Sequence, residues 1–252
     1  MPESSVLRLA MWSGPRNIST AMMRSWGNRA DTVVVDEPLY AHYLKVTGKD
    51  HPMAREVIAN GETDWRRVVH RLTSETMTPD RDEQPTPRIF YQKHMTHHLL
   101  PEMDRDWLDK LTNCFLIRDP AEVIASYLRK NEELALEDLG FQPQAEIFDW
   151  VCEQSGEIPP VIDARDVLQN PERSLRLLCH AVGVEFHPAM LSWPAGLRET
   201  DGVWARHWYH EVAQSTGFVP YRAECPVTPK RWREVEARCR ECYERLSEFR
   251  LR

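Results

Sequence analysis

The chain has 252 residues, of which 42% are hydrophobic, enough for the core of one α/β domain. Its 32 Lys and Arg residues against 39 Asp and Glu residues give a net charge of −7, and this balance excludes nucleic acid as the expected partner. The first residues lack the basic and apolar regions of a signal peptide, and no apolar run is long enough to span a membrane. An anion site in this chain must therefore be a local cluster of cations.

The first predicted unit is a strand, a tight loop and a helix. Residues 6–12 are an apolar run of strand length, and residues 13–17, Ser-Gly-Pro-Arg-Asn, interrupt it with turn-forming residues. Apolar residues then recur at helical spacing, at Ile18, Met22 and Trp26. A loop that leads from a strand into a helix presents backbone N–H groups to an anion.

The side chains of this loop predict a phosphate or a phosphate-linked sulfate as its ligand. Arg16 is a fixed cation in the loop, and Ser19 and Thr20 place hydroxyls in the first helical turn. The loop differs from the NTPase loop GxxxxGK[ST], because Ile18 stands where the lysine is needed. A turn that binds nothing is the alternative interpretation.

Further apolar runs predict four more strands, at residues 32–36, 89–93, 114–117 and 161–162. Helices are predicted within 40–77, over 120–130, around 147–152, over 171–182 and from about residue 229 onward. We expect the strand at 32–36 to be buried, and residues 78–88, 131–144 and 192–226 to be loops. Buried strands that alternate with helices imply a three-layer α/β/α fold with a central parallel sheet.

The loops at the carboxyl ends of parallel strands meet at one edge of the sheet, where ligands bind. The predicted loops of this kind are residues 13–17, 37–38, 93–98, 118–119 and 163–166. We therefore expect the polar side chains of these five loops to converge on one site.

The first loop resembles the 5′-phosphosulfate loop of the sulfotransferases that use PAPS (3′-phosphoadenosine 5′-phosphosulfate), whose bacterial members often carry P-R-S-G-S-T. A second family element is an arginine at a strand end with a serine eight residues later, which bind the 3′-phosphate; these are Arg118 and Ser126 here. Residues 160–183 resemble a third element. The resemblance covers about residues 6–185 and implies a P-loop NTPase-like fold of the bacterial small-molecule type, in one domain over residues 1–252.

The resemblance implies an enzyme that moves a sulfuryl group from PAPS to a hydroxyl or amine of a small-molecule acceptor and releases PAP, without a metal ion. Arg16 would neutralise charge on the leaving phosphate. The residues implied in PAPS binding are Gly14, Pro15, Arg16, Asn17, Ile18, Ser19, Thr20, Arg118 and Ser126. Two features depart from the family: Ala21 stands where cytosolic members stack a Trp on adenine, and their C-terminal Arg-Lys-Gly loop is missing. Residues 204–209 and 215–218 are the predicted substitutes.

Two candidates exist for the base that takes the acceptor proton. Glu37 is the first, because it ends a strand in Glu-Pro, as in bacterial trehalose sulfotransferase-like members. The second is the histidine cluster His94, His97 and His98, in which His97 and His98 are the named candidates. Lys93 and the residues after it resemble the K-T-H-L-P segment of cytosolic members, but Met95 occupies the position of the family's histidine. Lys93 would stabilise the transferring sulfate in either scheme. A salt-bridged Glu37 and structural histidines remain open.

The acceptor is expected between residues 40–77 and the aromatic loop 192–218, with ordinary packing of that loop as the alternative. A P-loop kinase for a small alcohol and a non-catalytic nucleotide-binding protein are the rival functions, and a homodimer is left open. Cys239 and Cys242 form a CxxC pair on the apolar stripe of the last helix. We expect these thiols to pack in the core of a cytoplasmic protein.

Overall fold

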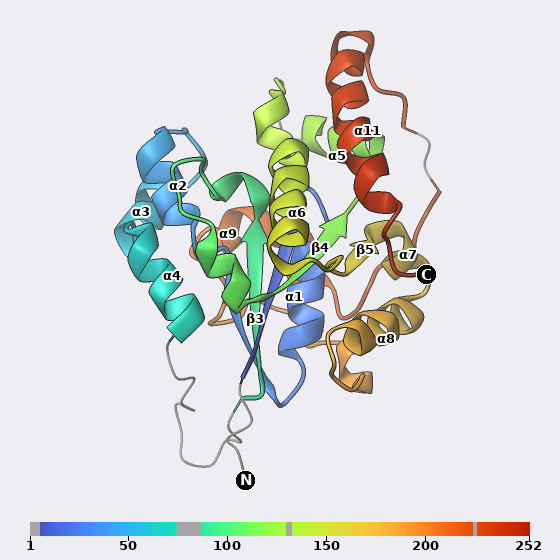
Figure 1. The fold of residues 1–252 in the computed structure, drawn as a ribbon. Helices are drawn as coiled ribbons and strands as arrows, with labels where there is room; N and C mark the ends of the chain where they lie inside the picture. Colours follow the sequence, from blue (N-terminus) through green and yellow to red (C-terminus); the bar gives the residue numbers. More distant parts are fainter. Residues whose placement is uncertain (1–5, 75–86, 130–132, 224–225) are drawn as a thin grey trace.

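The computed structural model describes residues 6–74, 87–129, 133–223 and 226–252. Most of the loop predicted at 78–88 therefore lies outside the described residues. Five strands form one parallel sheet in the order β2-β3-β1-β4-β5 (Figure 1). The strands are β1 (Leu7–Ser13), β2 (Thr32–Asp36), β3 (Ile89–Met95), β4 (Thr112–Ile117) and β5 (Val161–Asp163). All five predicted strands are confirmed.

The helices alternate with these strands along the chain. The α-helices are α1 (Ser19–Gly27), α2 (Tyr40–Thr47), α3 (Ala54–Asn60), α4 (Trp65–Ser74), α5 (Pro120–Leu128), α6 (Phe141–Ser155), α7 (Ala164–Gln169), α8 (Pro171–Ala181), α9 (Ala205–Trp208), α10 (His210–Gln214) and α11 (Arg233–Ser247). The 3₁₀-helices are η1 (Thr96–His98), η2 (Asp106–Lys110), η3 (Leu136–Leu139), η4 (Pro188–Leu191) and η5 (Lys230–Trp232).

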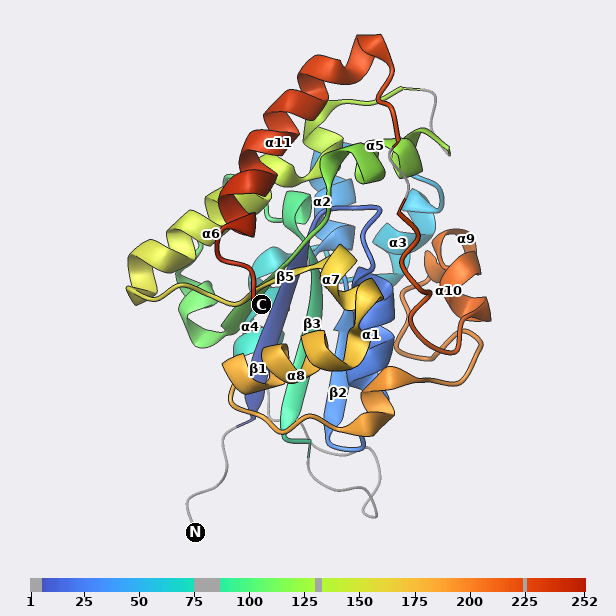
Figure 2. The same cartoon turned by 90° about the vertical axis from the view of Figure 1, so that its right-hand side faces the viewer.

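The sheet is the middle layer of three, as predicted. Successive residues of β1 face opposite sides: Met11 packs into the cluster that holds α1 and α8, and Trp12 into the cluster that holds α4 and α6. Figure 2 shows the sheet between α1 on one side and α4 and α6 on the other. Burial on both faces explains the apolar runs at residues 9–12 of β1 and 114–117 of β4.

The register of the sheet places the functional loops together. Ser13 at the end of β1 lies opposite Met95 of β3 and Leu116 of β4, and Asp36 at the end of β2 lies opposite Lys93. All strand pairs are parallel, so the carboxyl ends of the strands share one edge of the sheet, which is the upper edge for β3 and β4 in Figure 1.

Three predictions need correction. The strand at 32–36 is an edge strand that pairs with β3, and its first four residues are only half-buried. The segment 131–144 is not a continuous loop, because η3 and the first turn of α6 fold there; Leu139 and Phe141 are buried against Val123 and Ile124 of α5. The segment 192–226 contains the short helices α9 and α10.

The cysteines behave as the sequence predicts. Cys239 is buried and Cys242 is half-buried between α11 and its neighbours, and neither forms a disulfide.

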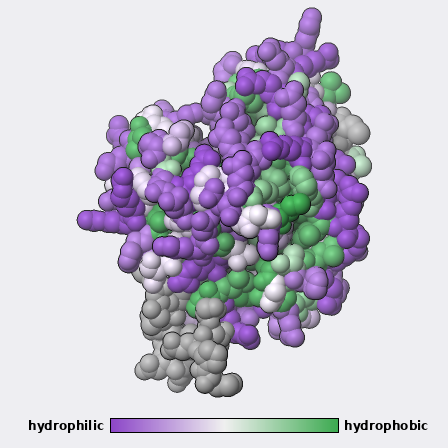
Figure 3. Space-filling view, viewed as in Figure 1, coloured by the Kyte–Doolittle hydropathy of each residue, from purple (hydrophilic) through white to green (hydrophobic). Residues whose placement is uncertain are grey.

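The face of the molecule seen in Figure 1 is mainly hydrophilic, with hydrophobic side chains gathered on its right-hand half (Figure 3). None of the helices in the described ranges has the length and apolar character to cross a membrane.

Candidate active site

The loop between β1 and α1 is held in a defined shape by its own residues. Asn17 donates from Nδ2 to the carbonyl oxygen of Leu116 (3.0 Å) and accepts at Oδ1 from the Ile18 N–H (2.8 Å). A Cβ on Gly14 would lie 2.6 Å from the carbonyl oxygen of Leu139, so the close approach of these segments requires glycine. Asn17 is therefore engaged in shaping the loop.

Two features of the same loop are typical of an anion site. First, no side chain caps the N-terminus of α1, so its first-turn N–H groups are available to a ligand. Second, Arg16 has a backbone φ of 56°, a left-handed conformation that is uncommon outside glycine and that concentrates at functional sites. Ser19 and Thr20 lie in the first turn of α1 and line the adjoining cavity.

The second motif comes from β4 and α5 and meets this loop. Arg16 donates from Nε to Ser126 Oγ (3.0 Å), and Arg118 donates from Nη1 to the Arg16 carbonyl oxygen (2.8 Å). Arg118 also donates from Nε to Glu122 (3.1 Å). Asp119 caps α5 by accepting from the Ala121 N–H (2.9 Å). The cap fixes the start of the helix that carries Ser126, so residues about 110 positions apart in the sequence form one polar group.

The ends of β2 and β3 build a second, largely buried polar group, in which the Glu37 side chain is 12% exposed. Lys93 Nζ donates to Asp36 Oδ1 (2.9 Å), Glu37 Oε1 (2.5 Å) and Tyr209 Oη (2.7 Å). Tyr209, which directly follows α9, donates in turn to the Asp36 carboxylate (2.8 Å), and Trp204 donates to Tyr209 (3.3 Å). An ammonium group has three N–H donors, so every donor of Lys93 is engaged.

The charges of this group perturb one another. Burial raises the pKa of Glu37, and the negative charge of Asp36 adds to the rise, while Lys93 opposes it. Burial lowers the pKa of Lys93, but the two carboxylates outweigh that effect and raise it well above its ordinary value. Glu37 also has a backbone φ of 40°, a second strained position among the described residues.

The histidines divide between the two faces of the sheet. His94 points away from the cavity, stacks on Trp12 at 4.3 Å between ring centroids and contacts Gln92, so it has a structural role. His98 stacks on Tyr40 and lies tilted against Tyr43, with 4.7 Å between ring centroids in each pair, and His97 lies edge-on to His98. Burial lowers the pKa of His97 to about 3 and that of His98 well below its ordinary value, so both rings are neutral near pH 7.

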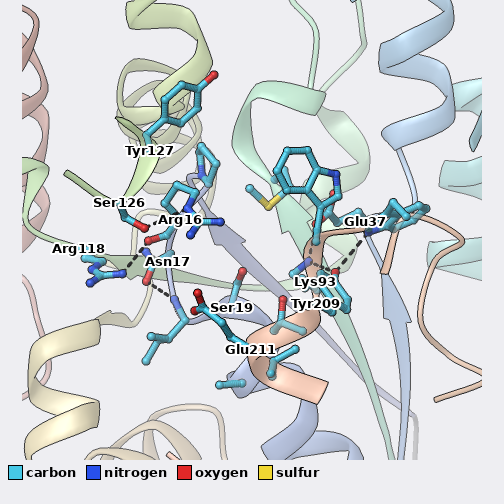
Figure 4. A pocket seen from close by; sticks show the side chains of 18 of the residues that line it. Arg16, Asn17, Ser19, Glu37, Lys93, Arg118, Ser126, Tyr127, Tyr209 and Glu211 are labelled. Carbon is cyan, nitrogen blue, oxygen red and sulfur yellow. Dashed lines mark hydrogen bonds and ion pairs between the residues drawn. The ribbon is translucent and has the colours of Figure 1, made fainter. Parts of the chain in front are cut away.

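One cavity of about 530 Å³ joins all of these groups. Figure 4 shows Arg16, Arg118 and Ser126 on one side and Lys93, Glu37 and Tyr209 on the other. The predicted site residues that line the cavity are Pro15, Arg16, Asn17, Ile18, Ser19, Thr20, Glu37, Lys93, His97, His98, Arg118 and Ser126. We call the side with Arg16, Arg118 and Ser126 the anion end, and the side with Glu37 and Lys93 the carboxylate end.

Four of the five predicted loops contribute residues to this cavity, whereas residues 163–166 contribute none, because Asp163 instead caps α7 and accepts from Tyr243. One predicted site residue is also absent from the lining. Gly14 does not line this cavity, because it lies beneath the loop against η3. The aromatic residues predicted for the acceptor pocket, Trp204, Trp208, Tyr209 and Phe218, line the cavity. Within the described ranges, no three His, Cys, Asp or Glu side chains are grouped to hold a metal ion.

The sequence does not predict two residues of the site, or the role of a third. Tyr209 lines the pocket as expected, but its hydroxyl also joins Asp36 and Lys93. Glu211 of α10 lines the cavity beside the anion end (Figure 4). Arg129 lines the cavity as well. Of these residues, only Arg129 could have been found from the sequence. It stands three residues after Ser126, a spacing that places both residues on one face of the helical turn at the end of α5.

Comparison with known proteins identifies the family of the chain. A family model described as "Sulfotransferase domain" matches residues 7–234. Two proteins of Arabidopsis thaliana, named branched-chain-amino-acid aminotransferase-like proteins 1 and 2, are 37% and 34% identical over 207 residues, which is 82% of this chain. The match covers 36% and 35% of those proteins, so the chain spans about a third of the length of these relatives.

Solved structures show the same fold. A sulfotransferase from Alicyclobacillus acidocaldarius superposes with a TM-score of 0.55 at 13% identity, covering 97% of this chain and 95% of that one. A sulfotransferase domain from the Synechococcus PCC 7002 olefin synthase superposes with a TM-score of 0.50 at 15% identity, covering 96% and 97%. At these identities the likeness is one of fold.

Proposed function

The chain belongs to the sulfotransferase domain family, and from that premise we propose that it transfers a sulfuryl group from PAPS to a hydroxyl or amine of a small molecule and releases PAP. The observation that carries this proposal is the cavity with two unlike ends. An anion end with arginines and free helix N–H groups faces a buried carboxylate whose pKa is raised by burial.

The residues of the anion end fit a donor with phosphates at two positions. The N-terminus of α1, with Ser19 and Thr20, would hold the 5′-phosphate, and Arg118 with Ser126 would hold the 3′-phosphate. PAPS, when bound, supplies the sulfuryl group and a phosphate as the leaving group. Arg16 would balance the negative charge that stays on this phosphate, and one donor of this kind lowers a barrier by about 3 kcal/mol.

Glu37 is the base that the electrostatics favour. As the acceptor oxygen or nitrogen bonds to sulfur and the bond from sulfur to the phosphate oxygen breaks, Glu37 takes the proton that the acceptor loses. A base is most effective when its pKa is near the working pH. Burial moves the pKa of Glu37 upward, toward that range, and moves the pKa of His97 and His98 downward, away from it.

Lys93 is assigned to positioning Glu37. Its three donors already serve Asp36, Glu37 and Tyr209, so no N–H is left for the transferring sulfate in this arrangement. The ion pair at 2.5 Å fixes one Glu37 oxygen, and the residue lines the cavity in which the acceptor would bind.

A transfer screen tests the proposed function. The protein is incubated with PAPS and panels of small alcohols, phenols and amines, and both PAP and the sulfated product are measured. We expect one class of acceptor to yield both in equal amounts. Binding of PAP without any product would favour the non-catalytic reading, and phosphorylation of an alcohol with ATP and magnesium would favour the kinase.

Other expectations stay predictions. These are a single domain over residues 1–252, a cytoplasmic location, a homodimer, and an acceptor bound between α2, α3 and residues 204–218. The cysteines in the described ranges are free thiols, which is consistent with the reducing environment of the cytoplasm.

A further inference from the structure

Three arginines, Arg16, Arg118 and Arg129, line the anion end of the cavity. Arg118 is paired with Glu122, and Arg16 donates to Ser126. Arg129 lines the same cavity and has no ion pair within the ranges that the structure describes. Arg129 is the guanidinium of this group that the proposed chemistry has not used.

Helix geometry places Arg129 next to Ser126. Arg129 directly follows α5 and keeps a right-handed helical backbone, with φ of −68° and ψ of −21°. It is three residues beyond Ser126, and residues three apart are neighbours on one helix face. Ser126 is buried while Arg129 is exposed, so the arginine continues the Ser126 face outward to the mouth of the cavity.

The charge of this group calls for an anion with more than one negative charge. The pKa of Arg16 is lowered, mainly by burial and further by the positive charges of Arg129 and Arg118, while Glu211 opposes the change. Three guanidinium groups around one space repel one another unless an anion lies between them. A phosphate monoester carries about −1.5 to −2 charges and several acceptor oxygens, which suits planar arginine donors.

We propose that Arg129 binds the 3′-phosphate of the donor and of its product, together with Arg118 and Ser126. This inference rests on the proposed function, because it takes the 3′-phosphate from the PAPS assignment. It makes Arg129 a specificity-determining residue: it distinguishes a nucleotide with a 3′-phosphate from the same nucleotide without one.

The test compares two ligands that differ only in that phosphate. Affinities for PAP and for AMP, which lacks the 3′-phosphate, are measured by calorimetry on the wild type, Arg129→Ala, Arg129→Lys and Arg173→Ala. Arg173 is an exposed helical arginine away from the cavity and serves as the matched control. Melting temperatures without ligand show that each variant is folded.

We expect Arg129→Ala to lose about tenfold in PAP affinity and to keep its AMP affinity, because one charge-assisted contact to an exposed arginine is removed. Arg129→Lys should fall in between, since it keeps the charge without the planar fork. An unchanged PAP affinity, or equal losses for PAP and AMP, would overturn the role of Arg129 alone. A wild type that binds AMP as tightly as PAP would overturn the donor assignment, and this inference with it.

Discussion

The anion end and the carboxylate end of the cavity are built in opposite ways. The anion end is made of a backbone loop, a helix N-terminus and partly exposed arginines, all from two short stretches of sequence, residues 14–20 and 118–129. The carboxylate end is made of side chains from three distant segments, and Lys93 and Asp36 within it are almost completely buried. We therefore expect the first end to bind a ligand without rearrangement, whereas the second depends on contacts among more distant segments.

This difference assigns separate tasks to the two ends. Exposed arginines and free N–H groups bind and release a charged ligand without unfolding anything. A buried carboxylate with a raised pKa and a cation fixed beside it is instead suited to moving a proton. Changes at the carboxylate end should therefore affect turnover and stability strongly, and changes at the anion end should mainly affect affinity.

Glu37→Gln should produce the largest effect. The amide cannot take a proton, so transfer should fall by roughly 10²–10⁴-fold, the usual contribution of a positioned base. PAP affinity should stay within about twofold, because Glu37 lies at the other end of the cavity. Single-turnover transfer and calorimetry with PAP measure the two quantities.

His98→Gln is the matched comparison for this prediction. The imidazole packs against the rings of Tyr40 and Tyr43, and the structure gives it no hydrogen-bond partner at Nδ1 within the described ranges. If Glu37→Gln stays active while His98→Gln or His97→Gln loses transfer, the histidine pair replaces Glu37 as the base.

Lys93→Met should be the most destabilising change. It leaves Asp36 and Glu37 buried without a cation, which costs roughly 3–5 kcal/mol of unfolding free energy near neutral pH. The deficit should shrink as the pH falls, because a carboxyl that lacks its cation has a higher pKa in the folded state and gains protons there. Urea unfolding at two pH values measures this, with the exposed Lys110→Met as the control. A loss of unfolding free energy that does not change with pH would contradict this prediction.

The pH profile of transfer separates the two candidate bases. If Glu37 is the base, the rate falls tenfold per pH unit below its raised pKa, so the fall begins above the ordinary value of 4.5. If His97 is the base, the rate holds down to about pH 3, its lowered pKa. The profile of kcat/KM, with folding monitored at each pH, distinguishes the two outcomes.

Glu211→Gln should produce the smallest effect, and this effect should be a gain in PAP affinity. Glu211 lines the cavity beside the arginines, and its charge repels an anionic ligand. Because the side chain is exposed, removing its charge should raise PAP affinity only a few-fold, and mainly at low salt. Calorimetry with Glu199→Gln as the exposed control tests this. A loss of affinity would instead make Glu211 a ligand of the nucleotide.

The contrast between the ends also explains what the sequence could predict. The strands, the loop at Gly14 to Thr20 and the pair Arg118 and Ser126 have local signals: an apolar run, turn chemistry, a fixed spacing. The contact between Arg16 and Ser126 follows from parallel strands whose ends meet at one edge.

The sequence contains no comparable local signal for the hydrogen bonds of the carboxylate end. Tyr209 reaches Asp36 only because α9 folds back over the sheet, across more than 170 residues of sequence. Nothing local predicts that all three donors of Lys93 are used, or that Glu37 has a positive φ. The helix start at Phe141 was missed for a similar reason, because its burial depends on α5 and α11.

The central claim is that the anion end binds a nucleotide with a 3′-phosphate and needs no magnesium to do so. The most direct measurement is the melting temperature of the wild type with PAP and with ADP at equal concentrations, each with and without magnesium. PAP should raise the melting temperature substantially more than ADP in the absence of magnesium, because a ligand stabilises the fold in proportion to the logarithm of its concentration over its Kd. Equal shifts for PAP and ADP, or a shift that requires magnesium, would contradict the claim.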